Sequence, residues 1–479
     1  MNPYNFRLKG NAVLGLSLLI FLFTSCKEST HDSGYSGEEK SQTVNNNFPD
    51  FGRMISPAEF QSKYPGEEVF RLRQDYPLTK PDDSELPEFL DIPFDEDERW
   101  MEYINAVRDY SFEGMIDVNF VAQENKKRNW YHMPWMHWGP QGSEGFHGLA
   151  KEAQIDPYQL GPGQTGSYQT YALGFYNEFA GYTLAQMWKN GDNPDPNATQ
   201  HPNGFPIGTV IFKLLFTDAD ESAADYLVNP MTWNAYITPT WNNGLDTGRV
   251  VKPMQLIQMD VMVRDPRADK YGTGWVFGTF CYNGKLNEGK EGSRRAENLV
   301  PVGIQFGNDP QDTTNFINPY PVTRTIINPN LKETKINPDS TKLPPQHLGW
   351  GGRLDGPVDL NTSSCMSCHA TAEFPQVAPL VPKEAFIGDT NAMGQLTKLT
   401  ETDAAAFRRY FENLKCATPY TETATSCDFS LQVSLALGYF TEWKDENVAG
   451  HWASEYLQTP TPMHRDGSLK VAPAEDNEL

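Results

Sequence analysis

The pentapeptide Cys365-Met366-Ser367-Cys368-His369 decides how the rest of this chain is interpreted. Two thiols at this spacing lie about one helical turn apart, so both can add to the vinyl groups of one porphyrin. The imidazole that follows the second thiol then faces the iron. The pattern predicts one covalently attached haem c, with thioether bonds at Cys365 and Cys368 and with His369 as the proximal iron ligand.

A chance pair, a disulfide or half of a zinc site would also place two cysteines at this spacing. A structural zinc site needs a second pair of ligands, and the remaining Cys and His residues offer no well-spaced second pair. A thioredoxin-like redox pair does not need a histidine directly after it. Haem attachment is the interpretation that uses both cysteines and the histidine.

The chain as a whole is acidic and rich in loops. It has 479 residues, a formal net charge of -23, 38 Gly and 36 Pro. This length allows two or three domains. Contacts to phosphate need clustered Lys and Arg, so the charge argues against a nucleic-acid partner, and it also disfavours direct docking on anionic lipid.

Residues 1–25 are expected to be a bacterial lipoprotein signal peptide. Their apolar run, Ala12 to Phe23, is too short to span a bilayer. The stretch that ends at Cys26 resembles a lipoprotein cleavage site, which implies lipidation of Cys26. Lys27 then favours the outer membrane, on its periplasmic or cell-surface face. Residues 26–50 are expected to form a polar, flexible tether. Export also places the haem motif outside the cytoplasm, where covalent haem attachment takes place.

Three cysteines remain after lipid and haem are assigned. Cys416 and Cys427 flank Pro419 and a Thr-rich loop, which makes them a plausible disulfide in an oxidising compartment. Cys281 ends an apolar run and is expected to be a small buried hydrophobic residue.

Residues 51–345 are predicted to form a β-rich domain with an N-terminal arm and one helix. The helix is indicated by a capping-box-like start at Asp95 and apolar residues at helical spacing between 100 and 110. Strands are expected at 207–216, 254–264, 274–281 and 300–306, joined by proline-marked turns that favour antiparallel pairing. Segment 171–188 is ambiguous between helix and strand, because two glycines interrupt it.

Residues 346–465 are predicted to form a mainly helical haem domain, followed by an acidic tail at 466–479. Helical spacing is clear at 407–414 and 431–443. The expected fold class is therefore α+β. Arg353, in a glycine-rich loop before the motif, matches a haem propionate in geometry, and equally well pairs with Asp355 or Asp359.

The stretch Trp130–Trp138 is the densest aromatic and sulfur cluster of the chain. It invites three interpretations: a soft metal site such as copper, the wall of a haem or substrate pocket, and ordinary core packing. The residues that carry the metal interpretation are His132, Met133, Met136, His137 and His147.

The motif, its preceding loop and the following helices resemble a cytochrome c-type haem domain over residues 346–465. A β-rich region before a C-terminal motif also resembles the cytochrome c prime-beta group. The family resemblance implies a sixth iron ligand, and Met463 resembles the proline-flanked distal methionine of class I cytochromes. Met393, a histidine (His464 or His347) and an open position are the alternatives.

Two functions follow from these expectations. The first is a membrane-anchored monohaem c-type cytochrome that passes electrons between redox partner proteins. The second is a haem-dependent oxidoreductase that acts on a small molecule or peroxide, at an open sixth position between the haem and the cluster Trp130–Trp138. The sequence leaves open whether the chain is an enzyme.

Overall fold

The structure is a computed structural model that describes most of residues 72–449. The gaps within that range are 97, 137–143, 145–146, 156, 158, 161–162, 238–249, 288–297, 312–321, 331–348, 360–362, 382–387, 391–395 and 400–403. Residues 43–44, 48, 57–63 and 65–66 are also described.

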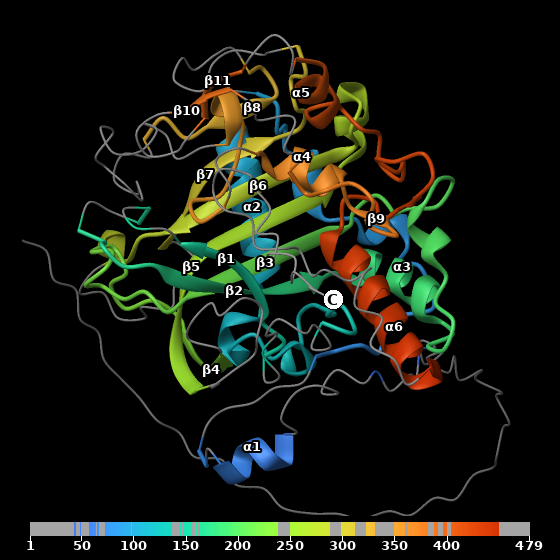
Figure 1. The fold of residues 1–479 in the computed structure, drawn as a ribbon, viewed down its shortest axis with the longest axis horizontal. Helices are drawn as coiled ribbons and strands as arrows, with labels where there is room; N and C mark the ends of the chain where they lie inside the picture. The colour runs from blue at the N-terminus through green and yellow to red at the C-terminus, as the bar shows by residue number, and fades with distance from the viewer. Residues whose placement is uncertain are drawn as a thin grey trace, which may run out of the picture. The chain divides into compact units, whose positions relative to one another are not determined.

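An antiparallel sheet of eight strands forms the centre of the described fold, and Figure 1 shows it face-on. Its order is β1-β2-β3-β5-β6-β7-β8, and β4 pairs with β5. The strands are β1 (Ala150–Ile155), β2 (Tyr168–Tyr176), β3 (Val210–Thr217), β4 (Thr232–Ile237), β5 (Val250–Arg264), β6 (Trp275–Tyr282), β7 (Leu299–Gln305) and β8 (Thr325–Ile327). The four predicted strands correspond to β3, β5, β6 and β7, and their antiparallel pairing is confirmed.

Six α-helices and two small two-stranded sheets complete the described elements. The helices are α1 (Pro57–Lys63), α2 (Trp100–Phe112), α3 (Glu178–Trp188), α4 (Cys365–Ala370), α5 (Ala404–Tyr410) and α6 (Leu431–Ala449). The small sheets pair β9 (Glu373–Phe374) with β12 (Thr425–Ser426), and β10 (Gly388–Thr390) with β11 (Leu396–Leu399). Short 3-10 turns lie at 83–85, 88–91, 116–118, 122–124, 196–199, 266–271, 284–287 and 350–352.

The ambiguous segment 171–188 contains both elements, β2 and then α3. The change occurs at Asn177, whose side chain caps α3 by accepting a hydrogen bond from the Ala180 amide at 3.2 Å. The predicted helix near residue 100 is confirmed as α2. It begins after Arg99 without a side-chain cap, so the predicted capping box at Asp95 is wrong.

The strands have a buried face on each side, because alternate side chains point to opposite faces. On β6, Val276 and Phe280 pack in the cluster that includes α2, whereas Phe277 and Cys281 belong to the cluster that includes α3, α4 and α6. Gly278 allows α2 to approach closely, since a β-carbon there would lie 2.3 Å from Ile104 Cδ1. The sheet is therefore covered on both faces, by α2 on one side and by α3, α4 and α6 on the other.

The fold is a mixed α+β arrangement, as predicted. However, residues 41–479 form one compact unit, so the predicted boundary at 345/346 does not separate two compact units. The physical reason is that α4 and α6 pack on the sheet itself, sharing one hydrophobic cluster with Trp275 and Phe277. Among the described residues, no helix is long and apolar enough to cross a membrane.

Candidate functional site

The predicted haem-attachment motif forms the short helix α4. Its first turn is fixed by a reciprocal capping box, in which the Ser367 amide donates to Ser364 Oγ at 3.1 Å and the Ser364 amide donates to Ser367 Oγ at 3.1 Å. Cys365 and Cys368 are both free thiols. Because they lie one turn apart on a helix, both are available to the same partner, as thioether attachment requires.

His369 is held by a hydrogen bond from the far side of its ring. Nδ1 lies 2.7 Å from the Phe429 carbonyl oxygen, to which it donates in the neutral tautomer. Burial, followed by the positive charge of Lys213, lowers the pKa of His369 to about 4. The imidazole is therefore neutral at pH 7 and keeps the Nε2 lone pair, which is the arrangement of a histidine that binds a metal.

A strained turn before α6 supplies that carbonyl. Asp428 and Phe429 both have left-handed backbone angles, with φ of 46° and 66°. The buried Asp428 carboxylate holds the turn by accepting hydrogen bonds from the Phe205 amide at 2.7 Å, the Ala417 amide at 2.8 Å and Trp275 Nε1 at 3.0 Å. These three bonds offset the cost of the strained angles and fix the Phe429 carbonyl against His369.

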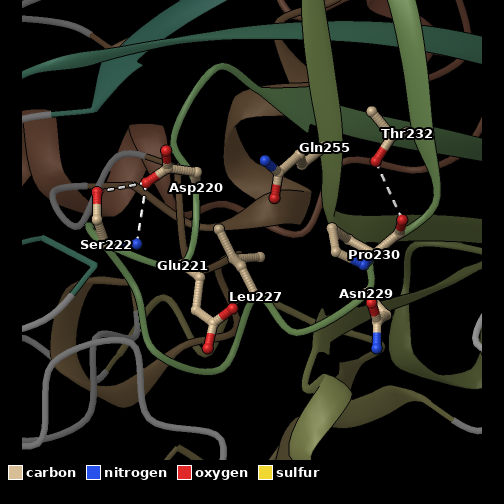
Figure 2. Close-up of a pocket in the computed structure, with 8 residues that line it drawn as sticks. All are labelled: Asp220, Glu221, Ser222, Leu227, Asn229, Pro230, Thr232 and Gln255. Carbon is tan, nitrogen blue, oxygen red and sulfur yellow. Dashed lines mark hydrogen bonds between the residues drawn. The ribbon is translucent and has the colours of Figure 1, made fainter.

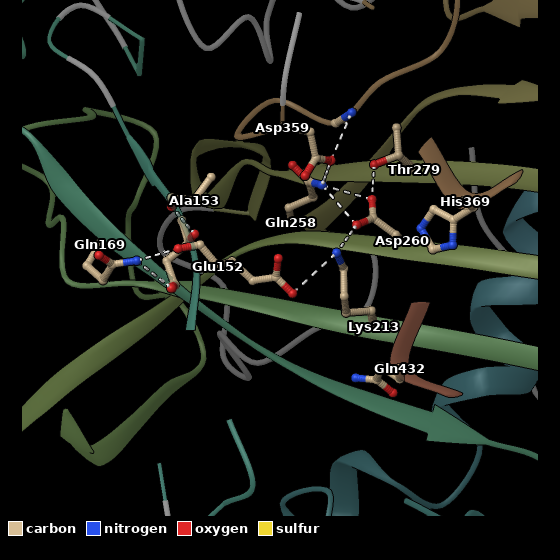
Figure 3. Close-up of polar contacts among 12 residues, drawn as sticks. Glu152, Ala153, Gln169, Lys213, Gln258, Asp260, Thr279, Asp359, His369 and Gln432 are labelled. Atoms are coloured by element: carbon tan, nitrogen blue, oxygen red, sulfur yellow. Dashed lines mark hydrogen bonds and ion pairs between the residues drawn. The ribbon is translucent and has the colours of Figure 1, made fainter. Parts of the chain in front are cut away.

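Beneath α4, four polar side chains form a row across β1, β3, β5 and β6, shown in Figure 3. Lys213 of β3 pairs in register with Asp260 of β5, which pairs with Thr279 of β6. Thr279 donates to Asp260 at 2.5 Å, and the Lys213 ammonium lies 3.6 Å from Asp260. Glu152 of β1 lies 3.8 Å from the same ammonium. We call Lys213, Asp260, Thr279 and Glu152 the polar row.

The loop before α4 is tied to this row through Gln258. The Gln258 amide donates to Asp359 at 2.7 Å and to Asp260 at 2.9 Å, and its carbonyl oxygen accepts from the Val358 amide at 3.0 Å. A β-carbon on Gly356 would lie 1.9 Å from Gln258 Nε2, so a larger residue there would displace the Gln258 amide from these hydrogen bonds. The loop thus carries Asp359 to the sheet face that bears the polar row.

The ionisable side chains of the polar row and its neighbours strongly affect one another's pKa. Burial, and repulsion from Asp359, raise the pKa of Asp260 to about 7 against the opposing effect of Lys213. Burial and the same neighbouring carboxylates raise the pKa of Asp355 well above its ordinary value. Burial alone would lower the pKa of Lys213, but the negative charges of Glu152, Asp260 and Asp359 together raise it by more. This lysine therefore stays charged.

The same surroundings keep both motif thiols neutral. Burial and the nearby carboxylates raise the pKa of Cys368 to about 12 and that of Cys365 well above its ordinary value. Cys365 Sγ lies 4.0 Å from Asp355 Oδ1. Neither thiol is therefore prepared for redox exchange as a thiolate, which weakens the thioredoxin-like interpretation of the pair.

Arg353 packs inside the loop that precedes α4. Its guanidinium is fully buried and donates to the backbone carbonyls of Asn308 at 2.6 Å, Asp309 at 2.8 Å and Trp350 at 3.0 Å. It also stacks over Phe411, 4.2 Å from the ring centroid. These contacts hold it in loop packing, and its role at a haem propionate stays a prediction.

The predicted disulfide is not formed in the structure, where Cys416 and Cys427 are both free thiols. Their backbones are anchored to different partners: the Cys416 amide donates to Thr273 at 3.0 Å and the Cys427 amide donates to Ala372 at 3.0 Å. Cys281 is buried, as predicted.

The described part of the cluster Trp130–Trp138 is ordinary core. Trp135 packs against Phe440 and Trp443 of α6, and Met133 and Met136 are buried in the same hydrophobic cluster. The two described histidines of this set contact different aromatic rings: His132 packs at a tilt against Phe175 of β2, and His147 stacks on Trp233 of β4. Within the described chain, no three His, Cys, Asp or Glu side chains are grouped to hold a metal ion.

Several predicted residues lie outside the described part of the chain. They are Cys26, His137, Trp138, His347, Met393, Met463 and His464. Lipidation and the sixth ligand therefore stay predictions.

A separate open pocket of about 430 Å³ lies beside the turns around β4 (Figure 2). It is lined by Asp220, Glu221, Ser222, Leu227, Asn229, Pro230, Thr232 and Gln255. The Asp220 carboxylate of this pocket already accepts a hydrogen bond within its own turn, from the Ser222 amide at 2.9 Å.

Comparison with known proteins found no matching family model, no matching curated protein and no matching solved structure.

Proposed function

We propose that this chain is a membrane-anchored monohaem c-type cytochrome, lipidated at Cys26, that transfers electrons between redox partner proteins at the bacterial outer membrane. The haem is attached at Cys365 and Cys368, and His369 is its proximal ligand. When bound, the haem supplies a centre that accepts and releases one electron at a time.

One observation carries the proposal: His369 Nδ1 lies 2.7 Å from the Phe429 carbonyl. A histidine that binds iron through Nε2 commonly donates its other ring N–H to a carbonyl, which fixes both the tautomer and the ring orientation. Here that bond occurs on the histidine of the attachment motif, directly after two free thiols on the same helix. A chance Cys-x-x-Cys pair would not need it.

The surrounding residues would support such a group. Phe277 lies beside His369, with ring centroids 5.2 Å apart, and provides an apolar wall from β6. The polar row and Gln432 of α6 provide polar groups on the sheet side of α4, where Figure 3 shows them with His369. The donor set therefore fits a haem with one apolar and one polar border.

Covalent attachment can be tested in the full chain, exported by a bacterial host that has a c-type cytochrome maturation system. After denaturing electrophoresis, haem staining should stay with the wild-type chain and vanish in the variant Cys365→Ser with Cys368→Ser. The matched control Cys416→Ser, which changes another free thiol, should stain like the wild type. An unstained wild-type band, or a stained double variant, would contradict the proposal.

The second candidate is the haem-dependent oxidoreductase, and the polar row favours it. Lys213, Asp260 and Glu152 keep 23%, 19% and 37% of their side-chain surface accessible, although they project from the sheet face covered by α4. An electron carrier needs no such charged, accessible groups. In an oxidoreductase of this kind, the polar row would border the substrate, rather than the cluster Trp130–Trp138.

Carbon monoxide separates the two candidates. A reduced haem with an open sixth position binds carbon monoxide rapidly, whereas a haem closed by methionine resists it. In the closed case, the ferric protein should show a sulfur-to-iron charge-transfer band that is lost in Met463→Ala.

A further inference from the structure

Asp355 is a buried aspartate whose carboxyl group has one oxygen without a hydrogen-bond partner. The residue is only 5% exposed. Its Oδ1 accepts a hydrogen bond from the Gly356 amide at 3.2 Å, whereas Oδ2 has no partner among the described residues. A buried polar atom without a partner is costly, and native proteins rarely keep one. This oxygen is therefore a candidate for a partner that the folded chain itself does not supply.

The same carboxyl group lies against the first thiol of the motif. Cys365 Sγ donates a weak hydrogen bond to Asp355 Oδ1 over 4.0 Å. The backbone fixes this contact at two points, because the Cys365 amide donates to the Leu354 carbonyl at 2.9 Å and the Trp350 amide donates to the Ser363 carbonyl at 2.8 Å. The segments 350–355 and 363–365 thus run side by side, and the loop holds Asp355 beside Cys365.

The second thiol of the motif has different surroundings. Cys368 lies one turn further along α4, and within the part of the chain that the structure describes its Sγ makes no hydrogen bond. A carboxyl group is therefore in contact with Cys365 and not with Cys368. The two thiols occupy the same helix but differ in the proton-transfer groups beside them.

The chemistry of attachment gives the carboxyl group a role. Thioether formation adds the S–H group of a cysteine across a vinyl double bond. The electron pair of the S–H bond forms the new S–C bond to the inner vinyl carbon, and the π pair forms a new C–H bond at the outer carbon. The step therefore needs one group that removes the thiol proton and one that supplies a proton to carbon.

A protonated carboxyl group can do both. Oδ1 accepts the proton from Cys365 Sγ while Oδ2 releases its own proton to the outer vinyl carbon. The carboxyl group of Asp355 ends with one proton, as it began, and no oxidant or reductant is consumed. Burial favours the protonated form of this group, in agreement with its raised pKa.

We propose that Asp355 is a catalytic residue for haem attachment at Cys365, where its two carboxyl oxygens carry the proton from the thiol to the vinyl group. This inference rests on the proposed haem attachment. It implies that Cys365 reacts with the help of Asp355, whereas Cys368 reacts without it.

The test compares the exported full-length wild type with Asp355→Asn, whose amide keeps the size and polarity of the side chain but does not exchange protons in this way. Each chain is denatured, alkylated, digested and analysed by mass spectrometry. In Asp355→Asn, haem should stay attached through Cys368, and the fraction of haem-bearing peptide with an alkylated Cys365 should exceed that of the wild type by about tenfold or more. The pyridine haemochrome band should move to longer wavelength, as in Cys365→Ser, because one vinyl group stays conjugated with the ring.

The matched control is Asp359→Asn, the same change on the same loop. Asp359 accepts from Gln258 at 2.7 Å, and its substitution should leave both thioether bonds in place. Asp355→Ser is the second variant if Asp355→Asn does not fold. A folded Asp355 variant with both bonds complete would overturn the inference, while haem attachment would stand. Loss of both bonds together in both Asp355 variants would overturn it as well, since that result marks a structural role. An unstained wild-type chain would overturn both the inference and the proposed function.

Discussion

Replacing Asp428 with alanine should destabilise the protein strongly, because this carboxylate accepts hydrogen bonds from three buried donors. The Phe205 amide, the Ala417 amide and Trp275 Nε1 donate to it at 2.7, 2.8 and 3.0 Å. Each buried donor left unsatisfied costs about 1–3 kcal/mol. Water entering the space left by the carboxylate recovers part of this, so we expect a loss of about 3–5 kcal/mol in the free energy of unfolding.

The same substitution should release the turn that holds His369. Without its carboxylate, the left-handed angles of Asp428 and Phe429 cost about 1–3 kcal/mol each and are no longer offset. The Phe429 carbonyl then moves away from the imidazole, and the absorption spectrum of the proposed haem should change along with stability. A residue that only fills space would change stability alone.

Urea unfolding followed by circular dichroism measures the loss. Asp428→Asn keeps one acceptor oxygen and should lose about half as much, about 2 kcal/mol. The matched control Asp83→Ala removes an exposed aspartate whose ion pair with Lys80 spans 3.4 Å, and it should cost about 1 kcal/mol at most. If Asp428→Ala cost no more than this control, the role assigned to the carboxylate would be refuted.

Three further predictions concern the site. Gly356→Ala should cost about 1–3 kcal/mol in urea unfolding, because its β-carbon would collide with the buried Gln258 amide; an unchanged midpoint would contradict the packing. The raised pKa of Asp260 means that the folded state binds its proton more tightly than the unfolded state, so this group's stabilisation falls as pH rises from about 4 to about 7. Asp260→Asn should remove that component from the pH dependence of unfolding. Because Cys416 and Cys427 are free thiols, dithiothreitol should leave the melting temperature unchanged, whereas a drop of several degrees would support the disulfide.

The sequence was sufficient for four of the eight strands of the central sheet, and for the helices α2 and α6. The alternation of apolar residues in 254–264 and the apolar runs at 207–216 and 274–281 reflect the buried faces of β5, β3 and β6. In these three strands the spacing of apolar residues in the sequence agrees with the observed burial of the side chains. The one-unit packing could not be predicted in the same way. Helical spacing predicts α6, but it does not say that its apolar face covers the sheet rather than a separate domain core.

The polar row was only half visible in the sequence. Lys213 interrupts an apolar strand, and Asp260 falls on the face opposite the predicted apolar positions of its strand. Each of these two residues, taken alone, is typical of a solvent-exposed position on a strand. Their meaning depends on strand register, which places Lys213, Asp260 and Thr279 side by side, and register is set by pairings distant in sequence.

The support of His369 could not be predicted at all. Its partner is a backbone carbonyl 60 residues further along the chain, and a backbone group leaves no signature in residue types. The contacts of Arg353 could not be predicted either. A guanidinium near a haem motif suggests a propionate, but the three backbone carbonyls that it satisfies are equally invisible in the sequence.

Mass spectrometry of one peptide tests the central claim most directly. Trypsin should release residues 354–383 as a single peptide that contains the whole motif, since no Lys or Arg lies between Arg353 and Lys383. From the exported full-length chain, this peptide should carry the mass of one haem, and neither Cys365 nor Cys368 should react with an alkylating reagent. Recovery of the peptide without haem, with both thiols alkylated, would contradict the account.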